Sequence, residues 1–152
     1  IVHRDVKPEN ILIQEGDFRK AKLADLGLAK PERSAQSYAT SSNIALGTPG
    51  FMAPEQTADA RSAGPPADVF SAGATLYALL TGSGPFPGTS LAHVLHDTVS
   101  RPHDPLPPSV GAATRRLVDR CLDKNPAGRP ANASVSSMAT TCSKTASRRR
   151  LR

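Results

Sequence analysis

The 152-residue chain is long enough for one domain with a hydrophobic core and too short for two ordinary domains. Only 38% of its residues are hydrophobic and 4% are aromatic, while 14 prolines and 11 glycines interrupt the chain, which predicts a loop-rich fold with few long helices. Five of the six net positive charges lie in residues 143–152, so the remainder of the chain is nearly neutral, which argues against specific binding of nucleic acid. No apolar run approaches the ~20 residues that span a bilayer, which argues against a membrane segment in this chain.

The first predicted element is a small β-hairpin. Short runs of apolar or mixed residues at 11–13 and 21–25 are separated by a polar stretch that contains Gly16 and Asp17, which is typical of two strands and a turn. Residues 31–50 are polar, rich in serine and without periodicity, so they are expected to form a long surface loop. Irregular structure is expected to continue from there to residue 68.

Three helices are predicted in the second half of the chain. Residues 68–82 are apolar on all sides, which favours a buried helix with Asp68 as its N-cap and Gly82 at its end. Residues 90–100, capped by Ser90 or Thr89, and residues 112–124 have the pattern of amphipathic helices. The chain is expected to end with a weaker helix over residues 132–142 that runs into a basic, disordered tail at 141–152.

The two cysteines, Cys121 and Cys142, lack the spacing of a metal site. They are expected to be reduced thiols, which favours a cytoplasmic location.

Three short motifs follow one another in a characteristic order. They are the H-R-D-x-x-x-x-N pattern of His3, Arg4, Asp5 and Asn10, the D-L-G of 25–27, and the A-P-E of 53–55. With them, residues 1–140 resemble part of a eukaryotic-like serine/threonine protein kinase domain, and the wording HRDVKPENIL with GTPGFMAPEQ resembles bacterial members of that family. The resemblance implies a kinase-like C-terminal lobe, mainly α with a small β-hairpin.

The resemblance implies roles for the residues of the first two motifs. Asp5 would act as the catalytic base on a Ser or Thr hydroxyl of a protein substrate, with Lys7 neutralising charge on the transferred phosphoryl group. Asn10 and Asp25 would be the ligands of Mg²⁺, which bridges the phosphates of ATP. Leu12 would lie under the adenine ring.

Other residues match the supporting positions of the family. Thr48 would bridge the catalytic loop and the loop that docks the substrate, and His3 would pack against Leu26. Asp68 would fasten the backbone of the catalytic loop, a role compatible with the N-cap. Glu55 and Arg129 would form a buried ion pair, the alternative being two exposed charges of little consequence.

The residue before Asp5 suggests a mode of regulation. A phosphate on the long loop could pair with the Arg4 guanidinium and order the segment. The candidate phosphorylation sites are Ser37, Thr40, Ser41 and Ser42. The alternative is that these hydroxyls only make a flexible polar loop.

In the family, the N-terminal lobe and the first helices of the C-terminal lobe precede the H-R-D motif, and we expect both to be absent from this chain. Leu76, Tyr77, Leu79 and Leu80 would then be incompletely covered, which predicts a marginally stable fragment that does not turn over ATP alone. The parent kinase would phosphorylate Ser or Thr on proteins, with the missing N-terminal lobe as its partner. Two alternatives are a truncated, pseudokinase-like binding module and a small-molecule phosphotransferase, although the second gives no reason for the GTPGFMAPE stretch.

Overall fold

The computed structural model of the chain describes residues 2–24, 47–59 and 63–131. This part of the chain is mostly helical and contains one two-stranded antiparallel sheet, so the expected class of a mainly α fold with a small hairpin is confirmed. The elements are the 3₁₀ turns η1 (Pro8–Asn10), η2 (Gln14–Gly16), η3 (Phe18–Lys20) and η5 (Pro126–Gly128), the strands β1 (Ile11–Ile13) and β2 (Ala21–Leu23), and the helices α1 (Pro54–Ala58), α2 (Pro65–Thr81), α3 (Leu91–Ser100) and α4 (Ala112–Cys121).

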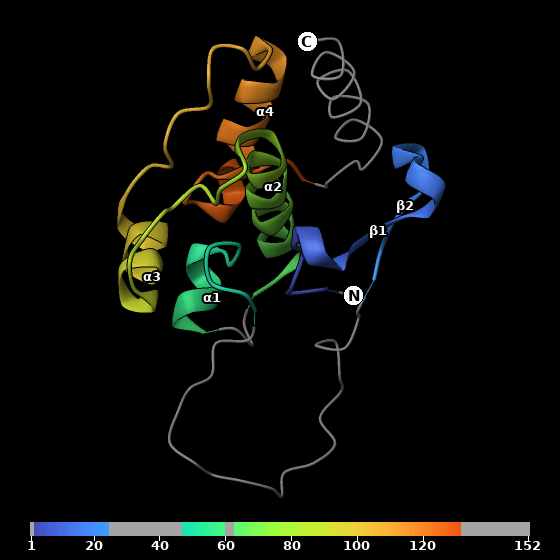
Figure 1. The fold of residues 1–152 in the computed structure, drawn as a ribbon. Helices are drawn as coiled ribbons and strands as arrows, with labels where there is room; N and C mark the ends of the chain where they lie inside the picture. The colour runs from blue at the N-terminus through green and yellow to red at the C-terminus, as the bar shows by residue number, and fades with distance from the viewer. Residues whose placement is uncertain (1, 25–46, 60–62, 132–152) are drawn as a thin grey trace, which may run out of the picture.

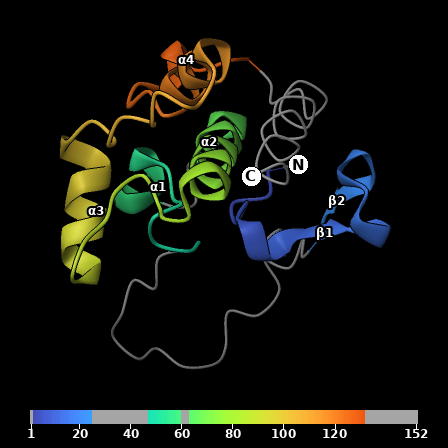
Figure 2. The same cartoon turned by 45° about the horizontal axis from the view of Figure 1, so that its top comes forward.

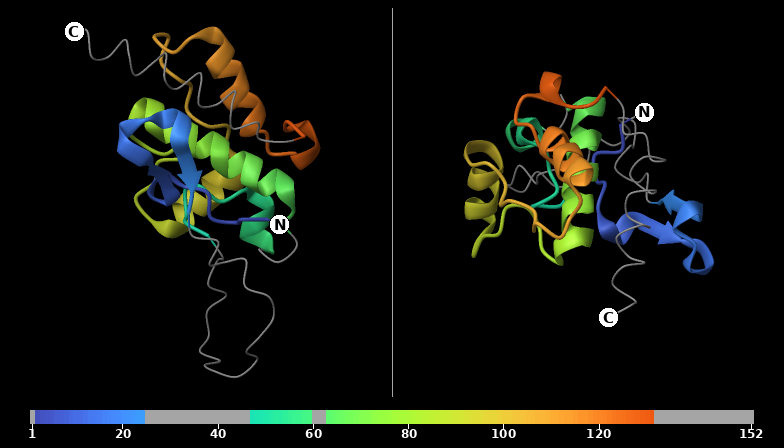
Figure 3. Two further views of the ribbon diagram at one scale, coloured as in Figure 1. Left: turned by 90° about the vertical axis from the view of Figure 1, so that its right-hand side faces the viewer. Right: turned by 90° about the horizontal axis from the view of Figure 1, so that it is seen from above.

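The arrangement centres on α2, which has the hairpin on one side and α3 on the other (Figure 1, Figure 2, Figure 3). Helix α4 and the turn η5 pack against α2, and so does η1, which directly precedes the hairpin. The short α1 packs against α3. Because α2 contacts the turn that follows Asp5, the central helix is placed to position the predicted catalytic loop, residues 3–10.

The hairpin forms where the apolar runs predicted it. Ile11 pairs with Leu23 and Ile13 with Ala21 in an antiparallel register. The turn includes Gly16, whose φ of 73° is in the left-handed region that glycine adopts readily. The second strand ends at Leu23, short of the predicted residue 25, and the two ends of the hairpin lie beside the catalytic loop.

Helix α2 begins at Pro65, three residues before the predicted start, and Gly64 is its N-cap. Proline at the first position fits because its fixed φ suits a helix and its missing N–H would have had no partner there. Asp68 therefore lies inside the first turn, and the expectation that it caps the helix is wrong. Gly82 ends the helix with a φ of 85°, as predicted.

The cover of α2 is more complete than the sequence suggested. Leu76, Tyr77 and Leu80 are each 5% exposed or less, and of the four residues expected to be incompletely covered only Leu79, at 51%, is open to solvent. The expectation was wrong for the other three because segments that follow α2 fold back over it. These segments contribute buried side chains to one cluster with α2, namely Phe86, Leu106, Val110, Val118 and Leu122.

Helices α2 and α4 approach one another closely at Gly73. A Cβ atom at that position would lie 2.5 Å from the Cβ of Cys121, a separation that side chains cannot adopt. Cys121 is a buried free thiol, and burial raises its pKa to about 11. Since the thiolate is the reactive form, this cysteine is a packing residue at the crossing, while Cys142 lies outside the described residues.

The remaining helices were predicted unequally well. Helix α3 follows Ser90, whose Oγ accepts a hydrogen bond from the N–H of His93, so the predicted N-cap is confirmed. Helix α4 ends at Cys121, three residues before its predicted end. Helix α1 was not predicted at all, since residues 51–68 were expected to be irregular. None of the helices in the described ranges is both long and apolar enough to cross a bilayer.

Candidate active site

The carboxylate of Asp5 lies at the centre of a small set of polar contacts. Its Oδ2 pairs with Lys7, with Nζ and Oδ2 3.0 Å apart. Its Oδ1 accepts a hydrogen bond of 2.8 Å from the Thr48 hydroxyl, which in turn accepts one of 2.7 Å from Lys7 Nζ. The Asp5 and Lys7 side chains are 11% and 22% exposed, so the three groups form a closed, partly shielded triangle.

Opposing effects set the pKa of the Asp5 carboxyl. Burial, the largest of them, raises the pKa because it disfavours the charged form. Hydrogen bonds from Lys7, Thr48 and Asn10, with the charge of Lys7, outweigh burial and hold the pKa below that of an ordinary aspartate. Asp5 is therefore ionised at neutral pH and can accept a hydrogen bond from a hydroxyl placed beside it.

Asn10 is oriented by the same carboxylate. Its Nδ2 donates to the backbone carbonyl of Asp5 at 2.7 Å and to Oδ2 of Asp5 at 3.2 Å. Since the amide nitrogen makes both contacts, the amide oxygen is the atom that can coordinate a cation, and Mg²⁺ prefers such hard oxygen ligands. Asp25, the other predicted ligand, lies outside the described residues, and those residues contain no cluster of three acidic, histidine or cysteine side chains able to hold a metal ion.

The residue directly before Asp25 is tied to the catalytic loop. Ala24 donates its N–H to the carbonyl of Asn10 at 2.7 Å, and the carbonyl of Ala24 lies 3.0 Å from Nε2 of His3. The N–H of Asp5 donates to Nδ1 of His3 at 3.4 Å, so Nε2 is the ring nitrogen that carries the proton. His3 thus links the loop that carries Asp5 to the strand that leads to Asp25.

Helix α2 holds the backbone of the catalytic loop at two points. The Asp68 carboxylate accepts hydrogen bonds of 2.8 Å from the N–H groups of His3 and Arg4. About two turns further on, the Thr75 hydroxyl lies 3.3 Å from the carbonyl of Val6 and donates to the backbone carbonyl of Ser71 at 2.8 Å. The contacts of Asp68 were expected from the resemblance, whereas Thr75 carried no signal in the sequence.

Gln56 is a second contact residue that the sequence reasoning missed. It is 2% exposed and lies in α1, where its Oε1 accepts a hydrogen bond from the N–H of Ala53. Its Nε2 donates to the backbone carbonyl of Arg4 at 3.1 Å. Its position directly after the A-P-E motif was the only available hint, because nothing else about a single glutamine indicates burial.

Glu55 and Arg129 form the expected ion pair. The Arg129 guanidinium donates to both carboxylate oxygens, at 2.7 and 2.9 Å, and its side chain is fully buried. It also donates to three backbone carbonyls, those of Pro66, Asp123 and Lys124. The guanidinium therefore joins α1, the start of α2 and the segment around η5, so the alternative of two exposed charges is wrong.

The remaining candidates are either exposed or outside the described residues. Leu12, expected under the adenine ring, is 59% exposed on β1. Leu26, expected against His3, and the candidate phosphorylation sites, Ser37, Thr40, Ser41 and Ser42, lie outside the described ranges with Asp25. The pairing of Arg4 with a phosphate therefore stays a prediction.

Comparison with known proteins agrees with the motifs. The model of the protein kinase domain family matches residues 1–140. Serine/threonine-protein kinase PknA of Mycobacterium tuberculosis is 39% identical over 129 residues, which cover 85% of this chain and 29% of that protein. Serine/threonine-protein kinase PknL of the same species is 40% identical over 141 residues, covering 88% of this chain and 33% of PknL.

A relative from another genus matches this chain to a similar extent. Serine/threonine-protein kinase PkaA of Streptomyces coelicolor is 40% identical over 132 residues, which cover 86% of this chain and 23% of that protein. The chain thus spans between about a quarter and a third of the length of the curated relatives it matches. With the family model matched over most of its length, the chain belongs to the protein kinase domain family.

Proposed function

We propose that residues 1–140 form the C-terminal lobe of a protein kinase domain that transfers the γ-phosphoryl group of ATP to a Ser or Thr hydroxyl of a protein substrate. The observation that carries the proposal is the Asp5 carboxylate, ionised and held by Lys7, Thr48 and Asn10. Phosphoryl transfer requires little covalent chemistry from the enzyme and depends on positioning and charge. The contacts of Asp5 supply both.

Each side chain has a defined task in this proposal. Asp5 accepts a hydrogen bond from the substrate hydroxyl, directs it at the phosphorus and takes its proton. Lys7 offsets the negative charge that develops on the transferred group. Thr48 fixes Asp5 and Lys7 relative to one another. Mg²⁺, held through Asn10 and Asp25, would neutralise the phosphates of the bound ATP.

We further propose that the N-terminal lobe of the kinase domain covers the hairpin. Three apolar side chains of β1 and β2 are exposed, namely Leu12, Ile13 and Leu23, at 59%, 40% and 45%. By the strand register Ile13 and Leu23 share one face of the sheet and Leu12 lies on the other. Exposed apolar groups on both faces of so short a sheet favour contacts with a further part of the protein, because their burial is a main source of binding free energy. Leu12 would then face the adenine of ATP, and the isolated chain would not turn over ATP.

The experiment compares the full-length protein with its Asp5→Asn variant, using ATP, Mg²⁺ and a mixture of Ser-, Thr- and Tyr-containing peptides. We expect the wild type to phosphorylate Ser or Thr, and the variant to lose about 10²- to 10⁴-fold in kcat, the usual contribution of a positioned acid or base. Asp17→Asn is the matched control, because the Asp17 carboxylate pairs with Arg19 at the tip of the hairpin, away from the catalytic loop.

Three outcomes would contradict the proposal. If the Asp5→Asn variant transfers phosphate as fast as the wild type, Asp5 is not the catalytic base. Phosphotyrosine as the main product would overturn the substrate class. A folded wild type that transfers no phosphate would favour the alternative of a pseudokinase-like binding module.

A further inference from the structure

The peptide that joins Arg4 to Asp5 has an unusual conformation. Arg4 has a φ of 68°, in the left-handed region that residues other than glycine seldom adopt. Such a conformation persists only where surrounding contacts hold it, and it is concentrated at functional sites. Since Asp5 is the next residue, the direction of this peptide determines where the Asp5 carboxylate points.

Two side chains from distant parts of the chain hold the backbone of Arg4, one at its N–H and one at its carbonyl. Asp68 accepts the N–H of Arg4 at 2.8 Å, and Gln56 donates to the carbonyl of Arg4 at 3.1 Å. Gly47 lies against the same carbonyl, because a Cβ atom there would be 3.1 Å from the oxygen. The family resemblance accounts for Asp68, but it assigns nothing to Gln56.

The surroundings of Gln56 fix its amide in one orientation. The side chain is 2% exposed, and burial of an amide is costly unless both of its ends are hydrogen-bonded. Its oxygen accepts the N–H of Ala53, the N-cap residue of α1, at 3.0 Å, so the nitrogen faces Arg4. Gln56 therefore couples the start of α1 to the residue before Asp5, across 52 positions of sequence.

We propose that Gln56 is a positioning residue for phosphoryl transfer, which binds the carbonyl of Arg4 and thereby fixes the peptide that carries Asp5. This inference rests on the function proposed above. It also implies that a displacement of α1 would be transmitted to Asp5 through one side chain, since Gln56 follows Glu55 directly in the helix. Gln56 acts through this carbonyl and not on the reacting groups themselves.

The test uses the full-length protein with Gln56→Met, which keeps the size of the side chain and removes its donor and acceptor. We expect kcat to fall about 10- to 100-fold, the scale of a small misplacement of a reacting group. The KM for ATP should change less than about twofold, because Gln56 acts through the Arg4 peptide and not through the residues proposed to bind nucleotide. Thr57→Val is the matched control, since the Thr57 hydroxyl donates to Pro54 within the same helix.

A second variant separates positioning from a purely structural role. In Gln56→Glu the carboxylate can still accept the N–H of Ala53, but it can donate to Arg4 only when it is protonated. Burial favours the protonated form, so the kcat of this variant relative to the wild type should recover as the pH is lowered from 8 to 6. A loss of stability alone would not produce this recovery at a temperature where both proteins are folded.

The outcomes distinguish this inference from the function on which it rests. A wild type without phosphate transfer would contradict the proposed function. An active wild type whose folded Gln56→Met variant keeps its kcat, or loses no more than Thr57→Val, would overturn the role of Gln56 alone. Should Gln56→Met fail to fold, a Gln56→Glu variant with full kcat at pH 8 would overturn it equally.

Discussion

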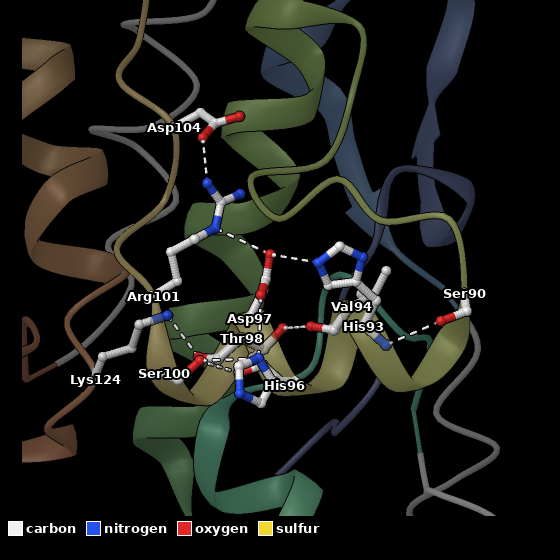
Figure 4. A network of polar contacts seen from close by, with 10 residues as sticks. All are labelled: Ser90, His93, Val94, His96, Asp97, Thr98, Ser100, Arg101, Asp104 and Lys124. Carbon is white, nitrogen blue, oxygen red and sulfur yellow. Dashed lines mark hydrogen bonds and ion pairs between the residues drawn. The ribbon is translucent and has the colours of Figure 1, made fainter.

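The catalytic loop and helix α3 both contain dense polar networks, but the two networks are built differently. Around the catalytic loop, the contacts join residues far apart in sequence: Lys7 with Thr48, Arg4 with Gln56 and Asp68, and Val6 with Thr75. Around α3, Asp97 contacts His93, His96 and Arg101, all within four positions of it (Figure 4). Arg101 extends this α3 network to Asp104.

The difference in sequence separation has a thermodynamic consequence. Apart from the contact of Lys124 with the carbonyl of Thr98, which Figure 4 also draws, the contacts of the α3 network lie within one helix and its immediate exit, so they can form as soon as the helix does. Those of the catalytic loop require α1, α2 and the loop to be packed first, and they fail together when any of these elements moves. The α3 network therefore affects mainly the stability of one helix. The contacts of the catalytic loop, in contrast, form only when the whole fold is intact.

The largest effect should come from the ion pair that joins the distant elements. Arg129→Met removes a guanidinium bound to Glu55 and to three carbonyls, and it leaves Glu55 without its partner. We expect the free energy of unfolding of the full-length protein to fall by about 3 to 5 kcal/mol, measured by urea denaturation. Arg101→Met is the matched control, and an equal loss in both variants would erase the contrast between the two networks.

An intermediate effect is expected where α2 holds the catalytic loop. In Asp68→Asn, the side chain keeps only one oxygen for the two N–H groups of His3 and Arg4, and its amide nitrogen meets one of them donor to donor. We expect a loss of about 2 kcal/mol in the free energy of unfolding. We also expect about a tenfold fall in kcat, because the backbone of Arg4 loses its hold at the N–H and only the Gln56 contact with its carbonyl remains.

The control for this change is Asp104→Asn in the α3 network, where the carboxylate is 45% exposed and bound by Arg101. It should leave kcat unchanged. A loss of stability in Asp68→Asn without any loss of kcat would show that Asp68 holds the fold but does not direct Asp5. Asp68 would then resemble the residues of the α3 network more than its neighbours around the catalytic loop.

The sequence predicted best the features that depend on near neighbours. The hairpin followed from two short apolar runs around Gly16, and α3 followed from Ser90 and an amphipathic pattern. Helix α1 was missed because five residues are too few to establish a period. The start of α2 was misplaced because an acidic residue was preferred as a cap over the proline three positions earlier, although proline is a good first residue of a helix.

The candidate site divides in a similar way. The motif spacing and the family resemblance were enough to assign Asp5, Lys7, Asn10 and Thr48 to one site. Gln56 and Thr75 were missed because each acts through a single backbone carbonyl that only the packed fold brings near. Each of the two residues is 2% exposed. Their burial depends on the tertiary packing, and a glutamine or a threonine in the sequence does not indicate it.

The smallest effect is expected in the α3 network itself. Arg101→Ala removes the contacts of a side chain that is 41% exposed, and Asp97 keeps His93 and His96 within 3.7 Å. Solvent around the Arg101 guanidinium weakens its pairing with Asp97, whose side chain is 10% exposed, so we expect the melting temperature of the full-length protein to fall by no more than about 2 °C. The difference should shrink further in ~1 M NaCl, which screens exposed charges. A shift as large as that of Asp68→Asn, or any change in kcat, would mean that α3 is coupled to the catalytic loop through α1, the element that packs against α3 and carries Gln56.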